Sequence, residues 1–194
     1  NTDTICVGDG PTIFRAVAGP RGRLGSVKIL RNRLFWVGFR QGPGAYSNIA
    51  AIECVRPAIG EIAGNFVEMS WGSAIFTFSG KKDKYIDREV PLTRLFIHHN
   101  KVVNAMLATN DWGGIAYWQG GPIYTYNNIA GNVIGYKPST PIENDWKTVA
   151  YNYYLDGTFK SYTFNNIAWG EFNEKTDPYR SRGPYFVVLG YMNH

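Results

Sequence analysis

The sequence predicts an all-β protein, and composition and residue patterning support that prediction together. Aromatic residues make up 15% of the 194 residues, glycine supplies 22 of them, and only 18% are charged. This composition favours β-strands joined by tight turns over helices. Apolar residues do not recur at sustained helical intervals, and the nearest candidate helix, 102–107, is short and rich in β-branched residues. A chain of this length suits one all-β domain that spans 1–194.

The clearest feature of the chain is an internal repeat. The string "YTYNNIA" at 124–130 returns as "YTFNNIA" at 162–168, and the similarity extends over 110–136 and 144–172. Both copies also contain Asn-Asp-Trp, but this tripeptide lies farther ahead of the second string than of the first. The second copy therefore carries extra residues. We place them at "LDGT", because a hairpin tip is where a repeat tolerates a change in length.

Each copy is expected to form a meander of three short strands. In the second copy the predicted strands are 149–155, 159–164 and 167–172. Asp156-Gly157 is a strong two-residue hairpin signal and supplies the first turn. Asn165-Asn166 supplies the second turn, because asparagine tolerates the left-handed backbone that tight turns require. The repeated asparagines are thus interpreted as turn residues before they are considered as ligand contacts.

Fainter copies upstream extend the repeat over the whole chain. Tryptophans recur at Trp36, Trp71, Trp112 and Trp146, so five units averaging about 39 residues would fill the sequence. A period near this length, with several short strands in each unit, is typical of β-propeller blades, between which a recurring tryptophan would pack. The sequence therefore predicts a small β-propeller-like array. The alternative is a two-sheet β-sandwich or jelly roll of lectin type, in which the two similar hairpins would be neighbours.

The second copy also resembles one blade of the small propeller lectins. In "VAYNYYLDGTFKSYTFNNIAWGEF" an aromatic strand, a glycine turn, a second strand, a polar pair and W-x-x-F follow one another in the order of such a blade. The resemblance implies a carbohydrate-binding propeller. The fucose-binding members use an arginine on the first strand and a glutamate on the second. Neither residue stands at the matching place here, so no specificity and no site are carried over.

The charge of the chain is basic and unevenly distributed. The formal net charge is +5 and the pI is about 9.2, and the stretch 15–33 contains basic residues with no acidic residue among them. One interpretation is a patch for an anionic partner such as an acidic glycan, formed by Arg21, Arg23, Arg31 and Arg33. The other is a solvated loop that promotes solubility. Nucleic acid is not favoured as a partner, because no recognition motif of that class is present.

The expected location of the protein follows from the hypotheses about its function, and no membrane span is expected. The sequence contains no run of 18 apolar residues, so no membrane-spanning helix is predicted. We expect a protein that is secreted or displayed on a cell or virion surface, and an oligomer is compatible with that role.

Cys6 and Cys54 are the two cysteines. They would form either a disulfide or two buried free thiols.

No catalytic or metal-binding constellation stands out in the sequence. Glu68 and Glu171 lie in aromatic strands, where a jelly-roll sugar hydrolase places its carboxyl pair, but a glutamate in an alternating strand usually faces solvent. His98 and His99 are adjacent, and adjacent residues of a strand point to opposite faces. We therefore expect no catalytic residue, no metal and no cofactor.

The abundant aromatic residues favour glycan recognition. Exposed aromatic rings can stack on the C–H faces of a pyranose while amide side chains bind its hydroxyl groups. The candidate ligand-binding residues are Trp118, Trp169, Tyr117, Tyr151, Asn128, Asn166 and Asn152. The preferred hypothesis is a non-enzymatic lectin, adhesin or cell-attachment domain. The alternatives are a structural or protein-interaction module and, third, a small glycan-active hydrolase with a Glu pair.

Overall fold

The computed structural model describes residues 5–7, 14–17, 24–38, 50–78, 94–107, 111–133, 135, 148–170 and 180–188. Within these ranges the chain forms β-strands and no helix, which confirms the all-β prediction. The strands are β1 (Ile5–Val7), β2 (Phe14–Val17), β3 (Leu24–Leu30), β4 (Arg33–Val37), β5 (Ala50–Val55), β6 (Pro57–Ala63), β7 (Phe66–Ser70), β8 (Ser73–Phe78), β9 (Arg94–His98), β10 (Lys101–Val103), β11 (Trp112–Gly120), β12 (Ile123–Tyr126), β13 (Ile129–Gly131), β14 (Thr148–Thr158), β15 (Ser161–Phe164), β16 (Ile167–Trp169) and β17 (Arg180–Val188).

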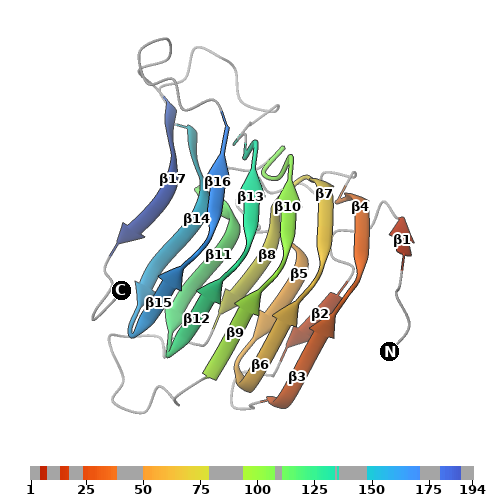
Figure 1. Cartoon of the computed structure of the whole chain (residues 1–194), viewed down its shortest axis with the longest axis vertical. Coiled ribbons are helices and arrows are strands. Elements are labelled where there is room, and N and C mark those ends of the chain that lie inside the picture. The colour runs from red at the N-terminus through yellow and green to blue at the C-terminus, as the bar shows by residue number, and fades with distance from the viewer. Residues whose placement is uncertain are drawn as a thin grey trace.

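These strands form three parallel sheets (Figure 1). Sheet A has the order β1-β4-β7-β10-β13-β16, sheet B the order β17-β14-β11-β8-β5-β2, and sheet C the order β15-β12-β9-β6-β3. Every strand therefore lies beside strands three positions away along the chain. The chain passes through sheet C, bends into sheet A, crosses to sheet B and then starts the next coil. Such a stack of coils is a parallel β-solenoid.

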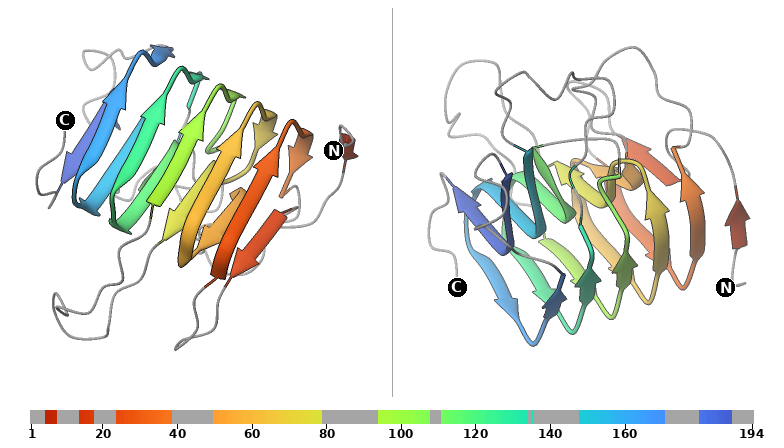
Figure 2. Two further views of the ribbon diagram at one scale, coloured as in Figure 1. Left: turned by 60° about the horizontal axis from the view of Figure 1, so that its bottom comes forward. Right: turned by 90° about the horizontal axis from the view of Figure 1, so that it is seen from above.

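The solenoid differs from both architectures that the sequence suggested. In a propeller blade, consecutive strands pair as an antiparallel meander, whereas here consecutive strands lie in different sheets and all pairing is parallel. The parallel sheets are equally unlike a jelly-roll sandwich. Figure 2 shows the three sheets running side by side from the first coils, in orange, to the last, in blue. The repeating unit of the structure is one coil of the solenoid, and not a meander.

Rows of aliphatic side chains fill the interior. Because successive residues of a strand point to opposite faces, one row from each sheet faces inward in every coil. In sheet B, Ile52, Ile75 and Ile115 are in register and completely buried. The inward rows of sheets A and C belong to the same core, and they include Leu34, Val67 and Val102 from sheet A and Ile29, Ile62 and Ile97 from sheet C. No single coil could bury these side chains without its neighbours.

A ladder of buried asparagines runs along the bend between sheets C and A. Asn32, Asn65, Asn100, Asn128 and Asn166 occupy the same position in successive coils. The Oδ1 of each ladder asparagine from Asn65 onward accepts the backbone N–H of the ladder asparagine before it, at 2.9–3.0 Å. The same oxygen also accepts a bond from that asparagine's Nδ2, at 2.9–3.0 Å. The ladder thus satisfies the polar groups that the bend would otherwise bury without partners.

The repeated "NNIA" strings are two rungs of this ladder and their bends. Asn127 and Asn165 have φ values of 54° and 53°, in the left-handed region, and the ladder residues Asn128 and Asn166 follow them. The predicted turn role is therefore confirmed. The predicted hairpin is wrong, because the chain bends from one sheet into the next instead of reversing its direction.

The predicted hairpin at Asp156-Gly157 is also wrong. Both residues lie inside the continuous strand β14, where Asp156 is in register with Trp118. The register between the two copies is uniform, since Ala116 pairs with Tyr154 and Tyr124 pairs with Tyr162. The extra residues of the second copy therefore lie ahead of Ala150, the register partner of Trp112, and do not form a hairpin tip. Gly157 keeps the positive φ, 63°, that an Asp-Gly turn would use.

The recurring tryptophans do not form one structural row. Trp36 is 47% exposed in a left-handed position near the end of β4 in sheet A, whereas Trp112 opens β11 in sheet B. Trp71 is half-buried after β7, and Trp146 lies outside the described residues.

Cys54 is a buried free thiol, and burial raises its pKa to about 12.

Candidate binding face

The outer surface of sheet C is the most regular solvent-facing surface among the described residues. Its side chains come from strands β3, β6, β9, β12 and β15, alternate with the inward row and stack in register from coil to coil. We call it the sheet C face, and it comprises Lys28, Glu61, Arg94, Phe96, His98, Tyr124, Tyr126, Lys160, Tyr162 and Phe164. Lys28 and Glu61 lie in its first two coils, the rings begin in β9, and the cations Arg94 and Lys160 lie at the starts of β9 and β15.

Two stacked columns of rings cover the later coils. In the first column, the ring centroids of Phe96 and Tyr124 are 5.2 Å apart, and those of Tyr124 and Tyr162 are 5.1 Å apart. In the second column, Tyr126 stacks on His98 at 4.8 Å and on Phe164 at 5.2 Å. Parallel, in-register strands place equivalent side chains one coil apart, which sets this spacing. Each aromatic pair adds about 0.5–1.5 kcal/mol beyond its buried area.

The stacking determines which ring surfaces a ligand can reach. The middle ring of each column, Tyr124 or Tyr126, has a neighbouring ring on both faces, so only its edge and hydroxyl group point outward. Tyr162 and Phe164 end the two columns in β15, where Tyr162 is half-buried and Phe164 is 49% exposed. The phenol groups of Tyr124 and Tyr162 line the first column in register. The face therefore combines these phenols with the exposed ring of Phe164.

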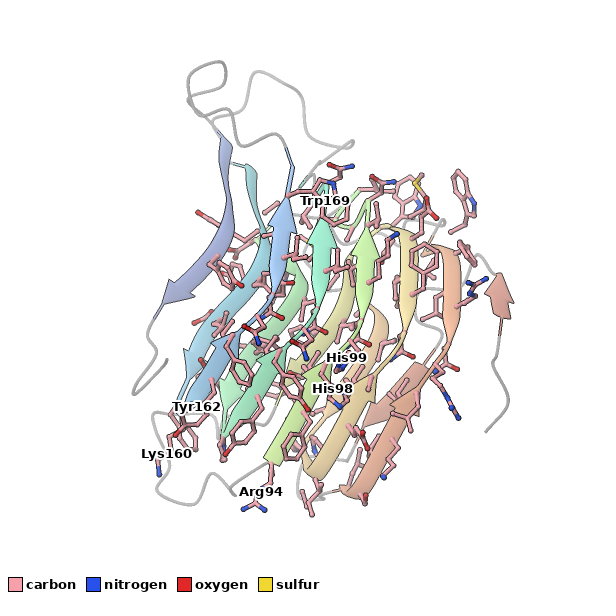
Figure 3. The ribbon with its side chains drawn as sticks, viewed as in Figure 1. Arg94, His98, His99, Lys160, Tyr162 and Trp169 are labelled. Atoms are coloured by element: carbon pink, nitrogen blue, oxygen red, sulfur yellow. The ribbon has the colours of Figure 1, made fainter. Side chains whose placement is uncertain are left out.

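Cationic side chains lie where the sheet C strands begin. Arg94 opens β9 and Lys160 directly precedes β15, and both residues are exposed. They occupy the same position in their coils, because Ile123 is in register with both Leu95 and Ser161. Figure 3 shows them at the same edge of the sheet, with Tyr162 beside Lys160. This edge can attract anionic groups toward the aromatic columns.

A polar network extends from within β3 and β6 to the bend that follows β9. Glu61 Oε1 is 3.4 Å from His98 Nε2, and Glu61 Oε2 is 3.3 Å from Lys28 Nζ. The Nδ1 atoms of His98 and His99 are 2.9 Å apart, and His99 Nε2 is 3.3 Å from Asn127 Nδ2. Burial is the main cause that lowers the pKa of His98 below its ordinary value, the charge of His99 lowers it further, and Glu61 opposes both.

The expected divergence of the two histidines is wrong. His98 ends β9, but His99 has a φ of 54° and belongs to the bend, so strand alternation does not apply to it. Both rings consequently lie on the outside of the solenoid, side by side (Figure 3). The left-handed backbone at His99 is the physical reason for the difference.

Four of the sequence-predicted ligand residues belong to the interior or to the ladder. Tyr117, Asn128 and Asn152 have no exposed surface, and Asn166 is a partly buried ladder residue. Tyr117 Oη lies 2.5 Å from Thr125 Oγ1, while Asn152 Nδ2 donates to the backbone carbonyls of Ala130 and Trp169. A ligand outside the solenoid cannot contact the three buried side chains.

The other three predicted ligand residues lie on two separate surfaces. Trp118 and Tyr151 are half-buried on the outer side of sheet B, where Trp118 stacks on Phe78 at 4.8 Å. Trp169 is 37% exposed on the outer side of sheet A, and its ring lies over Gly131. The structure therefore does not bring the seven predicted ligand residues together.

The predicted anionic patch is described only in part. Arg31 lies in the bend after β3 and Arg33 opens β4, and both are exposed, whereas Arg21 and Arg23 lie outside the described residues.

Glu68, from the hydrolase alternative, is in register with Phe35 and Val103, so no carboxylate flanks it within its row. Glu171 lies outside the described residues.

The sequence contained a weak signal for the residues that were missed. Phe96, Tyr124 and Tyr162 alternate with apolar residues in their strands, as half-buried strands require. Their assembly into columns depends on parallel register, which an antiparallel meander would not produce.

Comparison with models of known protein families, with curated proteins and with solved structures found no match. The protein is thus defined as a parallel β-solenoid by its fold, and its function is argued from its own surface. In the part of the chain that the structure describes, no helix is long and apolar enough to cross a membrane.

Proposed function

We propose that this β-solenoid is a non-enzymatic carbohydrate-binding protein and that its glycan lies on the sheet C face. The observation that carries the proposal is the pair of aromatic columns, in which one ring per coil recurs from β9 to β15, beside the cationic residues Arg94 and Lys160. A polysaccharide is itself a repeating chain, so rings that recur at one spacing along the solenoid axis match it in kind. A role at a cell or virion surface belongs to the same proposal.

The chemistry of the face suits a sugar chain. The open ring of Phe164 offers an apolar surface on which a pyranose can stack, and such contacts need no charge. The phenols of Tyr124 and Tyr162 can donate hydrogen bonds to hydroxyl groups or accept them. Arg94 and Lys160 favour a glycan that carries carboxylate or sulfate groups over a neutral one.

Binding to a panel of neutral and acidic polysaccharides, followed by affinity electrophoresis, tests the proposal. We expect Phe164→Ala to weaken binding about tenfold, because the stacking surface is lost. The matched control is Ile167→Ala, which removes an apolar side chain that is 57% exposed in the same coil but on sheet A. Equal losses in both variants, or no binding to any glycan of the panel, would contradict the proposal.

A second candidate function is a structural or protein-interaction module. It is favoured by the exposed apolar side chains of the last coil, among which Phe164, Ile167 and Trp169 are 49%, 57% and 37% exposed. The glycan panel separates the two functions, because a purely structural module binds no polysaccharide.

A further inference from the structure

We propose that His98 and His99 form a two-nitrogen site for a divalent transition metal of tetragonal preference, with Cu²⁺ as the best fit. The two imidazoles approach through their Nδ1 atoms, which are 2.9 Å apart on the outside of the bend between sheets C and A. The site shares His98 with the sheet C face but lies at the far end of β9 from the cationic edge, and it does not depend on glycan binding.

The separation of the two nitrogens is compatible with a shared metal. In the metal-free protein, the 2.9 Å between the Nδ1 atoms is the length of the hydrogen bond that joins the two rings. Imidazole nitrogens bind such metals at about 2.0–2.1 Å, so two bonds at a right angle also place the nitrogens about 2.9 Å apart. A small rotation that turns both lone pairs toward one point would let the two rings chelate one ion. Cu²⁺ and Ni²⁺ prefer tetragonal geometry with such right angles, and Cu²⁺ binds nitrogen ligands most tightly of the divalent first-row metals.

The surroundings hold both rings in place. His98 stacks on Tyr126 at 4.8 Å with an interplanar angle of 11°, and its Nε2 faces Glu61 Oε1 at 3.4 Å. A carboxylate on the far nitrogen of an imidazole fixes its tautomer and raises its basicity toward a metal. His99 is held by the left-handed backbone of the bend, and its Nε2 faces Asn127.

The proton positions in the metal-free protein agree with this arrangement. If His98 donates Nε2–H to Glu61, its Nδ1 is a free acceptor, and His99 Nδ1–H donates to it. A bound metal replaces that shared proton. The His99 proton then moves to Nε2, and the Asn127 side chain turns its oxygen toward it.

The site has two protein ligands and open positions. Among the described residues, no group of three or more histidine, cysteine, aspartate or glutamate side chains could hold a metal together. The remaining coordination positions therefore face solvent, and we expect a moderate affinity. Zn²⁺, which prefers tetrahedral coordination, should bind more weakly than Cu²⁺.

Titration of the protein with Cu²⁺ and Zn²⁺, read by calorimetry and by electron paramagnetic resonance of bound Cu²⁺, tests the proposal. We expect one Cu²⁺ per chain with two coupled nitrogens. His99→Asn should reduce the affinity at least tenfold and leave the fold intact, because asparagine occupies the same left-handed position at 127 and 165. The matched control, His194→Gln, should bind as the native protein does.

The contrary outcomes are equally specific. Unchanged Cu²⁺ affinity in His99→Asn, or a spectrum with fewer than two nitrogens, would overturn the site. Zn²⁺ binding as tight as Cu²⁺ would overturn the right-angle geometry. His98→Gln serves as a second variant, and equal losses in His98→Gln and His99→Asn are expected if both rings are ligands.

Discussion

At the scale of single residues, the ladder asparagines combine two tasks in one side chain. Asn100 Nδ2 donates to the Ile62 carbonyl and to Asn128 Oδ1, each at 2.9 Å. Its Oδ1 accepts the backbone N–H and Nδ2 of Asn65. The amide carries two donor hydrogens on its nitrogen and an acceptor on its oxygen, so one side chain can make all four bonds at once. The ladder therefore joins successive coils through buried, fully used polar groups.

Replacement of Asn100 by alanine should destabilise the protein strongly. The change removes one hydrogen-bond partner from each of the Asn65 N–H, the Ile62 carbonyl and Asn128 Oδ1. We therefore expect the free energy of unfolding to fall by at least about 2 kcal/mol. Denaturant unfolding followed by circular dichroism measures it.

The matched control for the ladder prediction is Asn165→Gly. Asn165 is exposed and has a φ of 53°, a conformation that glycine adopts freely. The change should alter stability by no more than about 0.5 kcal/mol. Similar losses in the two variants would show that the ladder bonds are not what stabilises the bend.

A residue-level signal for the ladder is present in the sequence but faint. Each ladder asparagine is followed two positions later by an inward aliphatic residue, namely Leu34, Val67, Val102, Ala130 or Ala168. Only the last two rungs share further residues, so only they were recognisable as a repeat. The turn role of asparagine could be predicted from its backbone preference. Its inward-pointing amide could not, because that depends on the neighbouring coil.

At the scale of elements, local turn signals misidentified the strand pairing. Asp156-Gly157 and Asn165-Asn166 both favour hairpins in isolation. In the solenoid, the flanking strands gain more from pairing with the equivalent strands of the next coil, where Tyr124 stacks on Tyr162 and Tyr126 on Phe164. Local alternation of apolar and polar residues shows where a strand forms. Which strand it pairs with depends on the contacts of the whole fold.

The contact between β13 and β16 gives a test at this scale. A Cβ atom at Gly131 would lie 2.1 Å from Trp169 Cε2, so Gly131→Ala must displace the indole ring. We expect it to lower the free energy of unfolding by about 1 kcal/mol and to change the tryptophan fluorescence of the folded protein. In a Trp169→Ala background the cost should vanish. An equal cost in both backgrounds would mean that the ring does not lie over Gly131.

At the scale of the whole molecule, the all-β class and the presence of a repeat could be predicted, because composition and periodicity report them directly. The architecture could not, since a propeller blade, a sandwich hairpin and a solenoid coil all use short alternating strands with polar turns. The candidate site was missed for the same reason. Trp118 and Trp169 were chosen as single residues, whereas the sheet C face exists only after the coils are stacked in register.

The solenoid also explains how one surface can support two separate sites. Equivalent positions along the coils carry different residues, so the row that contains Glu61 becomes aromatic from Phe96 onward. The histidine pair lies at the bend, and the cationic edge lies at the start of the strands. A stack of coils can therefore vary its surface residues locally without changing its core.

The central claim is the parallel pairing of successive coils, and paired cysteine substitutions test it most directly. Cys6 and Cys54 are first replaced by alanine. Tyr162→Cys is then combined with Tyr124→Cys, its register partner in the solenoid, or with Trp169→Cys, its partner in a hairpin closed by Asn165-Asn166. Because a disulfide requires Cα atoms within about 7 Å, only adjacent positions can be joined. The solenoid predicts oxidation of the pair at 124 and 162 and no cross-link between 162 and 169; the reverse result would contradict it.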